Sequence, residues 1–232
     1  MLKDKIIIIG GSGSIGSAIA KEVMNDGFEP YLIGRNYSSL EKLSKTLNCE
    51  FSKADVTKTD ELKKTLEKCG DNIYGLAYCV GSISIKSLSL ANENDYLDSF
   101  KVNTLGAIIA IQTLKDVLKK NNGTILLFSS IAVKQGFPNH TIISTSKGGI
   151  EGLTVSLAAE LAPNVKVNCI APSLTESEMS KSIISNQNIK KTIESLHPIP
   201  KIGQPDDHSK LAAYLLGKSN SWITGQILNI DG

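Results

Sequence analysis

The sequence lacks any hydrophobic run long enough to cross a membrane. Its apolar stretches, such as residues 105–111, are far shorter than the roughly 18 residues that a membrane-spanning helix requires. The first residues, Met1 to Lys5, lead directly into a strand-like pattern instead of forming a signal peptide. We therefore expect a soluble, cytoplasmic protein without a membrane partner.

The chain also lacks a strong charge of either sign and any cysteine pattern typical of a metal site. The formal net charge is +2 and the Lys and Arg residues are scattered, which predicts no nucleic-acid partner. The four cysteines have no C-x-x-C spacing, and three of them lie in strand-like apolar surroundings. We expect reduced thiols in the core, with neither a zinc site nor a disulfide framework.

Short apolar runs alternate with segments of helical periodicity, and no internal repeat or linker interrupts them. This pattern is typical of βαβ units that build a parallel sheet covered on both faces. Strands are predicted at residues 5–9, 30–33, 49–52, 73–79, 124–129, 165–170 and 226–230. Helices are predicted at residues 14–25, 38–47, 59–69, 94–119, 141–161 and 206–216. A length of 232 residues with 41% hydrophobic content suits one α/β domain of this kind.

A glycine-rich segment lies between the first predicted strand and the first predicted helix. Glycines allow a tight turn and close approach to a pyrophosphate, while a helix N-terminus offers free N–H groups. This placement favours dinucleotide binding over a plain structural turn. The contacts are expected from Gly10, Ser12, Gly13, Ser14, Ile15 and Gly16. Together with the alternating pattern, the segment predicts a single-domain Rossmann-type, doubly wound parallel sheet over residues 1–232.

The second predicted strand is followed by Arg35 and Asn36, with no acidic residue placed to accept a hydrogen bond from a ribose 2′-hydroxyl. Arg35 is able to pair with a 2′-phosphate instead. This favours NADP(H) over NAD(H). The alternative is that Arg35 is a solvated surface cation.

Further motifs follow in an order that resembles the short-chain dehydrogenase/reductase superfamily over essentially the whole chain. They are Asp55-Val56-Thr57, Asn103 within residues 100–106, Ser129-Ser130, Ala171-Pro172, and residues 222–226 with Asp231-Gly232. The resemblance implies that Asp55 and Val56 hold the adenine. Further cofactor contacts are expected from Val80, Gly81, Lys147, Pro172 and Leu174. Residues 78–81 and Ser173 differ from the residues that the family usually carries there.

The resemblance also implies a catalytic group. Ser130 would hold the substrate oxygen, Lys147 the nicotinamide ribose, and Asn103 a water that relays protons to the lysine. The family's tyrosine, which exchanges a proton with that oxygen, would stand at Ile143, four residues before Lys147. Isoleucine can neither donate nor accept a proton.

His140 is the hypothesised substitute for the missing acid. On a helical period, residues 140, 143, 144 and 147 share one face, which places His140 one turn before Ile143. Enoyl reductases of the superfamily carry their tyrosine seven residues before the lysine, which is also the spacing of His140 from Lys147. A helix-capping or surface role is the alternative for His140. His197 and His208 are expected to be structural or solvated.

Three functions remain open. The chain is predicted to be an NADP(H)-dependent oxidoreductase that acts on the carbonyl or alcohol of an unknown small molecule. The alternatives are a catalytically silent NADP(H)-binding sensor or scaffold, and a reductase of an activated C=C bond. Residues 173–201 are polar and weakly periodic, and we interpret them as a possible substrate lid or an exposed excursion. By resemblance, the long helices would form a homodimer or homotetramer.

Overall fold

A single seven-stranded parallel sheet organises the computed structural model, which describes residues 3–232. Met1 and Leu2, which belong to the segment expected to lead into the first strand, lie outside the described residues. The strands are β1 Lys5–Ile9, β2 Glu29–Gly34, β3 Glu50–Lys53, β4 Ile73–Tyr78, β5 Thr124–Phe128, β6 Lys166–Pro172 and β7 Ile227–Ile230. Their order in the sheet is β3-β2-β1-β4-β5-β6-β7. This is the doubly wound order, so the predicted fold class is confirmed.

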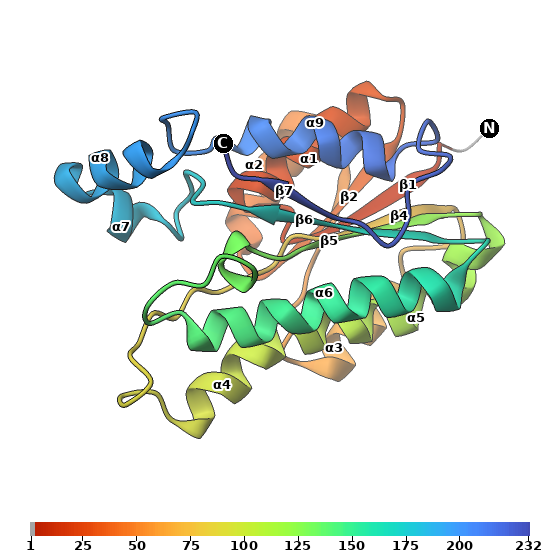
Figure 1. Ribbon diagram of the computed structural model, residues 1–232. Coiled ribbons are helices and arrows are strands. Elements are labelled where there is room, and N and C mark those ends of the chain that lie inside the picture. The colour runs from red at the N-terminus through yellow and green to blue at the C-terminus, as the bar shows by residue number, and fades with distance from the viewer. Residues whose placement is uncertain (1–2) are drawn as a thin grey trace.

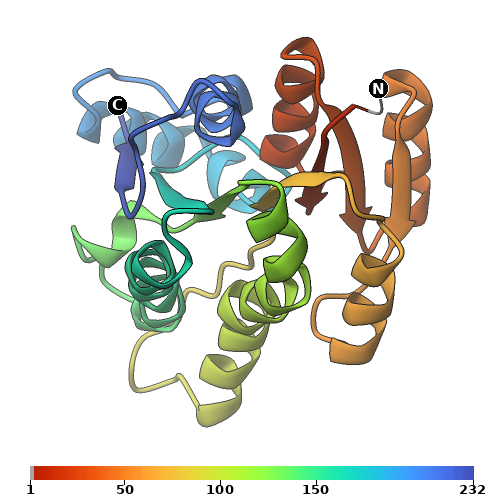
Figure 2. The ribbon, with the colours of Figure 1, turned by 90° about the vertical axis from the view of Figure 1, so that its right-hand side faces the viewer.

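Helices cover both faces of the sheet (Figure 1, Figure 2). One layer contains α1 Ser14–Asn25, α2 Tyr37–Leu47 and α9 Pro205–Leu216. The other contains α3 Thr59–Glu67, α4 Glu93–Phe100, α5 Gly106–Lys120 and α6 Thr141–Leu161. Alternate residues of β1 enter different cores: Ile6 and Ile8 pack in the cluster that includes α1 and α9, and Ile7 and Ile9 in the cluster that includes α3 and α5. Burial on both faces explains why the central strands are continuous apolar runs.

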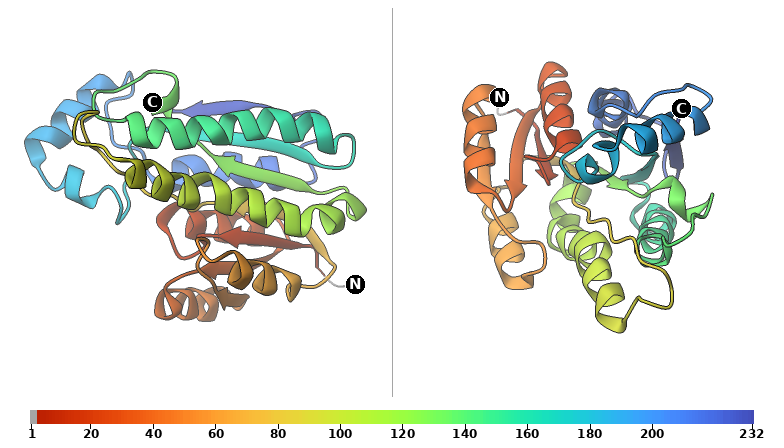
Figure 3. Two further views of the ribbon diagram at one scale, coloured as in Figure 1. Left: turned by 90° about the horizontal axis from the view of Figure 1, so that it is seen from below. Right: turned by 90° about the vertical axis from the view of Figure 1, so that its left-hand side faces the viewer.

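The carboxyl ends of all strands lie along one edge of the sheet, because every neighbouring pair is parallel. Chain order reverses between β1 and β4, and ligands of open α/β sheets bind in the crevice at such a point. Two short helices, α7 Lys181–Ile184 and α8 Gln187–Leu196, lie beyond this edge (Figure 1, Figure 3). They occupy the segment interpreted as a lid, and that role stays a prediction.

The helix predicted over residues 94–119 is present, but its bonding is not α-helical throughout. Helices α4 and α5 are joined by a π-helical turn, Lys101–Leu105, called the π-turn below. In it the N–H of Gly106 donates to the carbonyl of Lys101, five residues back, where an α-helix would use Val102. Side chains compete for the local carbonyls, since the amide of Asn103 donates to the carbonyl of Ser99. Apolar periodicity does not reveal such a competition.

The other predicted elements agree with the structure to within a few residues, and α1 and α6 begin and end where predicted. No helix bounds were predicted for the segment that contains α7 and α8. The four cysteines are all free thiols, with Cys69 and Cys169 buried and Cys49 and Cys79 half-buried. Within residues 3–232, none of the helices combines the length and apolarity that a membrane span requires.

Candidate cofactor and active site

The glycine-rich loop after β1 is shaped by close backbone contacts. Gly10 has a φ of 86°, a left-handed conformation that glycine adopts without steric cost. A Cβ on Gly16 would collide with the carbonyl oxygen of Gly10. Helix α1 begins at Ser14, and its N-cap residue, Gly13, provides no side-chain cap. The first turn of α1 therefore presents backbone N–H groups at the carboxyl edge of the sheet, as an anion site requires.

The turn after β2 exposes Arg35 next to Asp55. The side chain of Asn36 is occupied, because its Oδ1 accepts from the N–H of Ser39 at 3.1 Å and caps α2. Asp55 is half-buried and accepts from the N–H and hydroxyl of Thr57 at 2.9 and 2.7 Å. These bonds and, more weakly, the charge of Arg35 hold the pKa of Asp55 below its ordinary value. Arg35 thus lies exposed at the strand end with a negative group nearby.

Lys147 is buried where β4, β5 and α6 meet. Its side chain donates from Nζ to the carbonyl of Phe128 at 2.8 Å, and only 7% of the residue is exposed. Burial lowers the pKa of Lys147 to about 8. A Cβ on Gly81 would lie 3.5 Å from Lys147 Nζ and 3.3 Å from Asn103 Oδ1. Gly81 therefore leaves room for a lysine and an amide that reach the same place from different elements, with half-buried Val80 beside them.

Asn103 is fully buried and held on both sides of its amide. Its Oδ1 accepts from the N–H of Ser82 at 3.1 Å, and its Nδ2 donates to the carbonyl of Ser99 at 2.9 Å. The π-turn is bonded to α6 as well, because the hydroxyl of Thr104 donates to the carbonyl of Ser146 at 2.7 Å. The Ser146 hydroxyl in turn donates to that of Ser99 at 2.9 Å. These bonds tie the Asn103 turn to the residue that precedes Lys147.

Sequence reasoning missed these serines and Thr104, although a signal was present. Ser99 and Asn103 are four residues apart, so they lie on one helical face, and both are buried among apolar positions. A polar pair on an apolar face must find hydrogen-bond partners. That requirement could have identified the network, but not its partners on α6.

The two serines after β5 have different environments. Ser129 is buried and donates to Glu151 Oε1 at 2.8 Å, which is a structural contact with α6. Ser130 is half-buried, and its Oγ accepts from the N–H of Ala132 at 3.2 Å at the start of a 3₁₀ turn. An oxygen that accepts from a backbone N–H keeps its own hydrogen for donation. Ser130 is therefore the serine of this pair with a donor to offer at the sheet edge.

Ile143 is 5% exposed and lies on α6 one turn before Lys147. His140 is the N-cap residue of α6, but its side chain makes no cap bond. Its ring packs against Phe137 with centroids 5.4 Å apart, and Nδ1 lies 2.7 Å from the carbonyl oxygen of Pro138. A carbonyl only accepts, so Nδ1 carries a hydrogen and Nε2 of the neutral ring is an acceptor. In this conformation His140 can donate from Nε2 only as the imidazolium.

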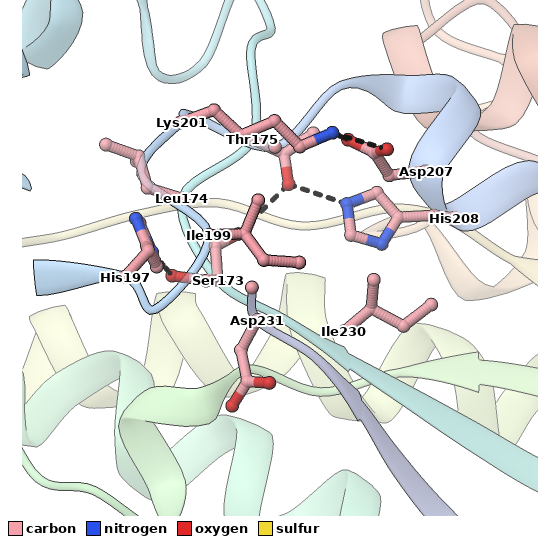
Figure 4. A pocket seen from close by; sticks show the side chains of 12 residues that line it. Ser173, Leu174, Thr175, His197, Ile199, Lys201, Asp207, His208, Ile230 and Asp231 are labelled. Atoms are coloured by element: carbon pink, nitrogen blue, oxygen red, sulfur yellow. Dashed lines mark hydrogen bonds and ion pairs between the residues drawn. The ribbon is translucent and has the colours of Figure 1, made fainter. Parts of the chain in front are cut away.

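The end of β6 forms one wall of a cavity of about 190 Å³. Pro172 ends the strand, and Leu174 lines the cavity together with the two remaining histidines (Figure 4). His197 Nε2 lies 2.7 Å from the Ser173 hydroxyl, and His208 Nε2 lies 2.8 Å from the hydroxyl of Thr175. His208 is 1% exposed, and burial lowers its pKa. Both histidines thus support the junction between β6 and the segment that carries α7 and α8.

Comparison with known proteins finds a family model, curated reductases and a solved structure that are similar to this chain over nearly its whole length. Residues 10–232 match the model of a family described as enoyl-(acyl carrier protein) reductase. The 3-oxoacyl-(acyl-carrier-protein) reductase FabG of Chlamydia trachomatis is 29% identical over 97% of this chain and 95% of that protein. FabG of Rickettsia bellii is 30% identical, over 97% and 94%. The structure of ElxO with NADP bound has a TM-score of 0.92 at 27% identity, covering 100% of this chain and 98% of that one.

The lowered pKa of Lys147 predicts how stability depends on pH. Between about pH 8 and the ordinary lysine pKa near 10.4, the unfolded chain binds more protons than the folded one, so folding becomes more favourable as pH rises. Relative to a Lys147→Met variant, the unfolding free energy of the wild type should rise by up to about 1.4 kcal/mol per pH unit in this range. Urea denaturation at pH 7 to 10 measures it. The exposed-lysine variant Lys63→Met is the control, and a flat wild-type-minus-Lys147→Met difference would contradict the prediction.

Proposed function

This chain belongs to the short-chain dehydrogenase/reductase superfamily, and on that premise we propose that it is an NADP(H)-dependent oxidoreductase. The substrate class is a small molecule with a carbonyl or alcohol group. One observation carries the proposal: Lys147 Nζ and Asn103 Oδ1 both approach Gly81 at the edge of the sheet where the glycine-rich loop ends. Relatives named as 3-oxoacyl reductases, and a similar structure that binds NADP, support it.

The residues at this edge fit a nicotinamide dinucleotide. Side chains at Gly10 or Gly16 would collide with backbone, so the loop keeps the open surface that a pyrophosphate requires. We assign the pyrophosphate to this loop, the 2′-phosphate to Arg35, the adenine to Asp55 and Val56, and the nicotinamide ribose to Lys147. When bound, the cofactor supplies or accepts the hydride. Binding and orientation are then the work of the chain itself.

The proton must come from a group other than residue 143, because the buried side chain of Ile143 has no polar atom. We propose that Ser130 donates a hydrogen bond to the substrate oxygen and that His140, as the imidazolium, provides the proton. The carbonyl of Pro138 would hold Nδ1–H and leave Nε2–H for the substrate. A positioned acid is worth typically 10²- to 10⁴-fold in rate.

Reduction of an activated C=C bond is the second candidate. Two observations favour it: the matched family is described as an enoyl-(acyl carrier protein) reductase, and the position one turn before Lys147 is apolar. Hydride addition to a β carbon needs an oxyanion to be stabilised, which Ser130 could do without a phenol at position 143. Hydride transfer to an enone but to no simple ketone would favour this candidate over the first.

Replacing Arg35 tests the cofactor assignment. Arg35→Ala should weaken NADPH binding about 10- to 100-fold, the range expected for a lost charge-assisted hydrogen bond, and leave NADH binding unchanged. Fluorescence titration with both cofactors measures the dissociation constants. Lys45→Ala removes an exposed cation from the last turn of α2 and serves as the matched control. Equal losses for NADPH and NADH would disprove the 2′-phosphate role.

Position 143 tests whether only the acid is missing. Ile143→Tyr restores a phenol one turn before Lys147, whereas Ile143→Phe adds a ring of similar size without the hydroxyl. We expect Ile143→Tyr to reduce simple ketones with NADPH roughly 10²- to 10⁴-fold faster than Ile143→Phe. Steady-state kinetics on a panel of ketones provides the comparison. Equal rates in two folded variants would mean that the pocket no longer accepts a carbonyl there.

Removing the imidazole tests the proposed donor. His140→Ala should lower kcat roughly 10²-fold or more for the best carbonyl or enone substrate and leave NADPH affinity unchanged. The control is Lys134→Ala, a change at an exposed position of the same loop. If the wild type binds NADPH yet transfers no hydride to any substrate class, the silent sensor replaces the enzyme. If His140→Ala has wild-type kcat, the donor assignment is wrong while the reductase stands.

A further inference from the structure

Tyr78 forms an unusual contact with the π-turn. It is the last residue of β4, only 1% exposed, and its hydroxyl donates to the carbonyl of Val102 at 2.7 Å. In a regular α-helix that carbonyl would accept from the N–H of Gly106. Here the Gly106 N–H bonds to Lys101 instead. The phenol therefore satisfies the acceptor that the π-turn leaves without its helical partner.

Gly106 provides the space for this phenol. A Cβ at this position would collide with the Tyr78 hydroxyl oxygen and lie 3.1 Å from Cβ of Val56. Burial also raises the pKa of Tyr78, so the hydroxyl remains protonated and keeps its hydrogen for Val102. Tyr78 thus supplies the hydrogen bond to Val102, and the absence of a Cβ on Gly106 leaves room for the Tyr78 hydroxyl.

Loss of the phenol would leave two outcomes for the helix. Either the carbonyl of half-buried Val102 loses its partner, or the chain returns to α-helical bonding between residues 102 and 106. A π-helical turn contains one residue more than an α-helical turn, and an α-helix advances about 100° per residue. A return to α-helical bonding would therefore rotate Asn103 relative to α5. Its amide would then leave Ser82 and the space beside Gly81. The position of Asn103 therefore depends on whether residues 101–106 have π-helical or α-helical hydrogen bonds.

We propose that Tyr78 is a positioning residue, whose hydroxyl holds the π-turn and thereby keeps the Asn103 amide next to Lys147. The effect of Tyr78 on turnover rests on the proposed function, whereas its effect on the π-turn does not. Tyr78 touches neither Lys147 nor Asn103 through a hydrogen bond of its own; within residues 3–232 its side chain bonds only to Val102. It acts through the backbone.

The first experiment compares two tyrosines of the same strand. Tyr74 is 7% exposed and stacks on Phe28 with ring centroids 5.5 Å apart, and its hydroxyl makes no hydrogen bond within residues 3–232. Tyr78→Phe should lower kcat roughly 100-fold with KM for NADPH within about twofold, since small displacements of catalytic groups cost this much. Tyr74→Phe should leave both values unchanged. Equal kcat values in the two variants would overturn the proposal.

A double variant separates positioning from stability. In Tyr78→Phe/Gly106→Ala the collision with the hydroxyl oxygen is removed, whereas the new Cβ still lies 3.1 Å from Cβ of Val56 and 3.3 Å from Cζ of residue 78. Residue 106 is then free to bond to Val102, which favours a regular helix. We expect Tm of the double variant to lie above that of Tyr78→Phe, because alanine is a better helix former than glycine and the Val102 carbonyl regains a backbone partner. We expect kcat to stay roughly 100-fold low despite this recovery. Recovery of kcat together with Tm would show that Tyr78 is merely structural.

A cofactor-free measurement keeps the proposal independent of the activity. The Asn103 side-chain amide is fully buried, so its protons should exchange slowly in the wild type and in Tyr74→Phe. Exchange should be at least tenfold faster in the double variant, as measured by NMR of the side-chain amide. Slow exchange in the double variant overturns the positioning role. If the wild type reduces no substrate, the proposed function fails, and this measurement still decides whether Tyr78 holds the turn.

Discussion

The burial of the Lys147 ammonium is the constraint on which the rest of the site depends. A buried cation normally requires a carboxylate, yet within residues 3–232 Lys147 forms no salt bridge. Its charge is met by the carbonyl of Phe128 at the end of β5. That carbonyl is available because β5 ends there, and the backbone turns away into Ser129 and Ser130. The lysine is therefore held at the strand end and keeps a lowered pKa of about 8.

A hydrogen-bonded network connects the turn that carries Asn103 to the helix that carries Lys147. Hydrogen bonds join Thr104 to Ser146, and Ser146 to Ser99, so the π-turn is bonded directly to α6. Buried polar networks of this kind stabilise a fold only when their members are satisfied. The π-turn meets that condition by using side chains, including Tyr78, for carbonyls that a regular helix would satisfy internally.

The burial of Lys147 also affects how the apolar side chain of Ile143 is interpreted. Burial of a lysine without a carboxylate partner costs folding free energy, because desolvation disfavours its charged form. Here the apolar residue stands at position 143, while the costly lysine and the buried amide of Asn103 are retained. The arrangement favours a site that still binds a cofactor. His140 lies at the start of the same helix, but its ring is bonded to its own loop at Pro138.

The sequence by itself determined the alternation of strands and helices, the bounds of α1 and α6, and the glycine-rich loop after β1. These features depend on local periodicity and on the conformational freedom of glycine, which are legible without tertiary contacts. Only the tertiary structure decided the π-turn, because its acceptor is satisfied by Tyr78, 24 residues away from Val102. It likewise decided which nitrogen of His140 carries the hydrogen. Each depends on a hydrogen bond between a side chain and a backbone carbonyl, Tyr78 to Val102 and His140 to Pro138. Sequence periodicity cannot identify such a partner, because the two groups come together only when the chain has folded.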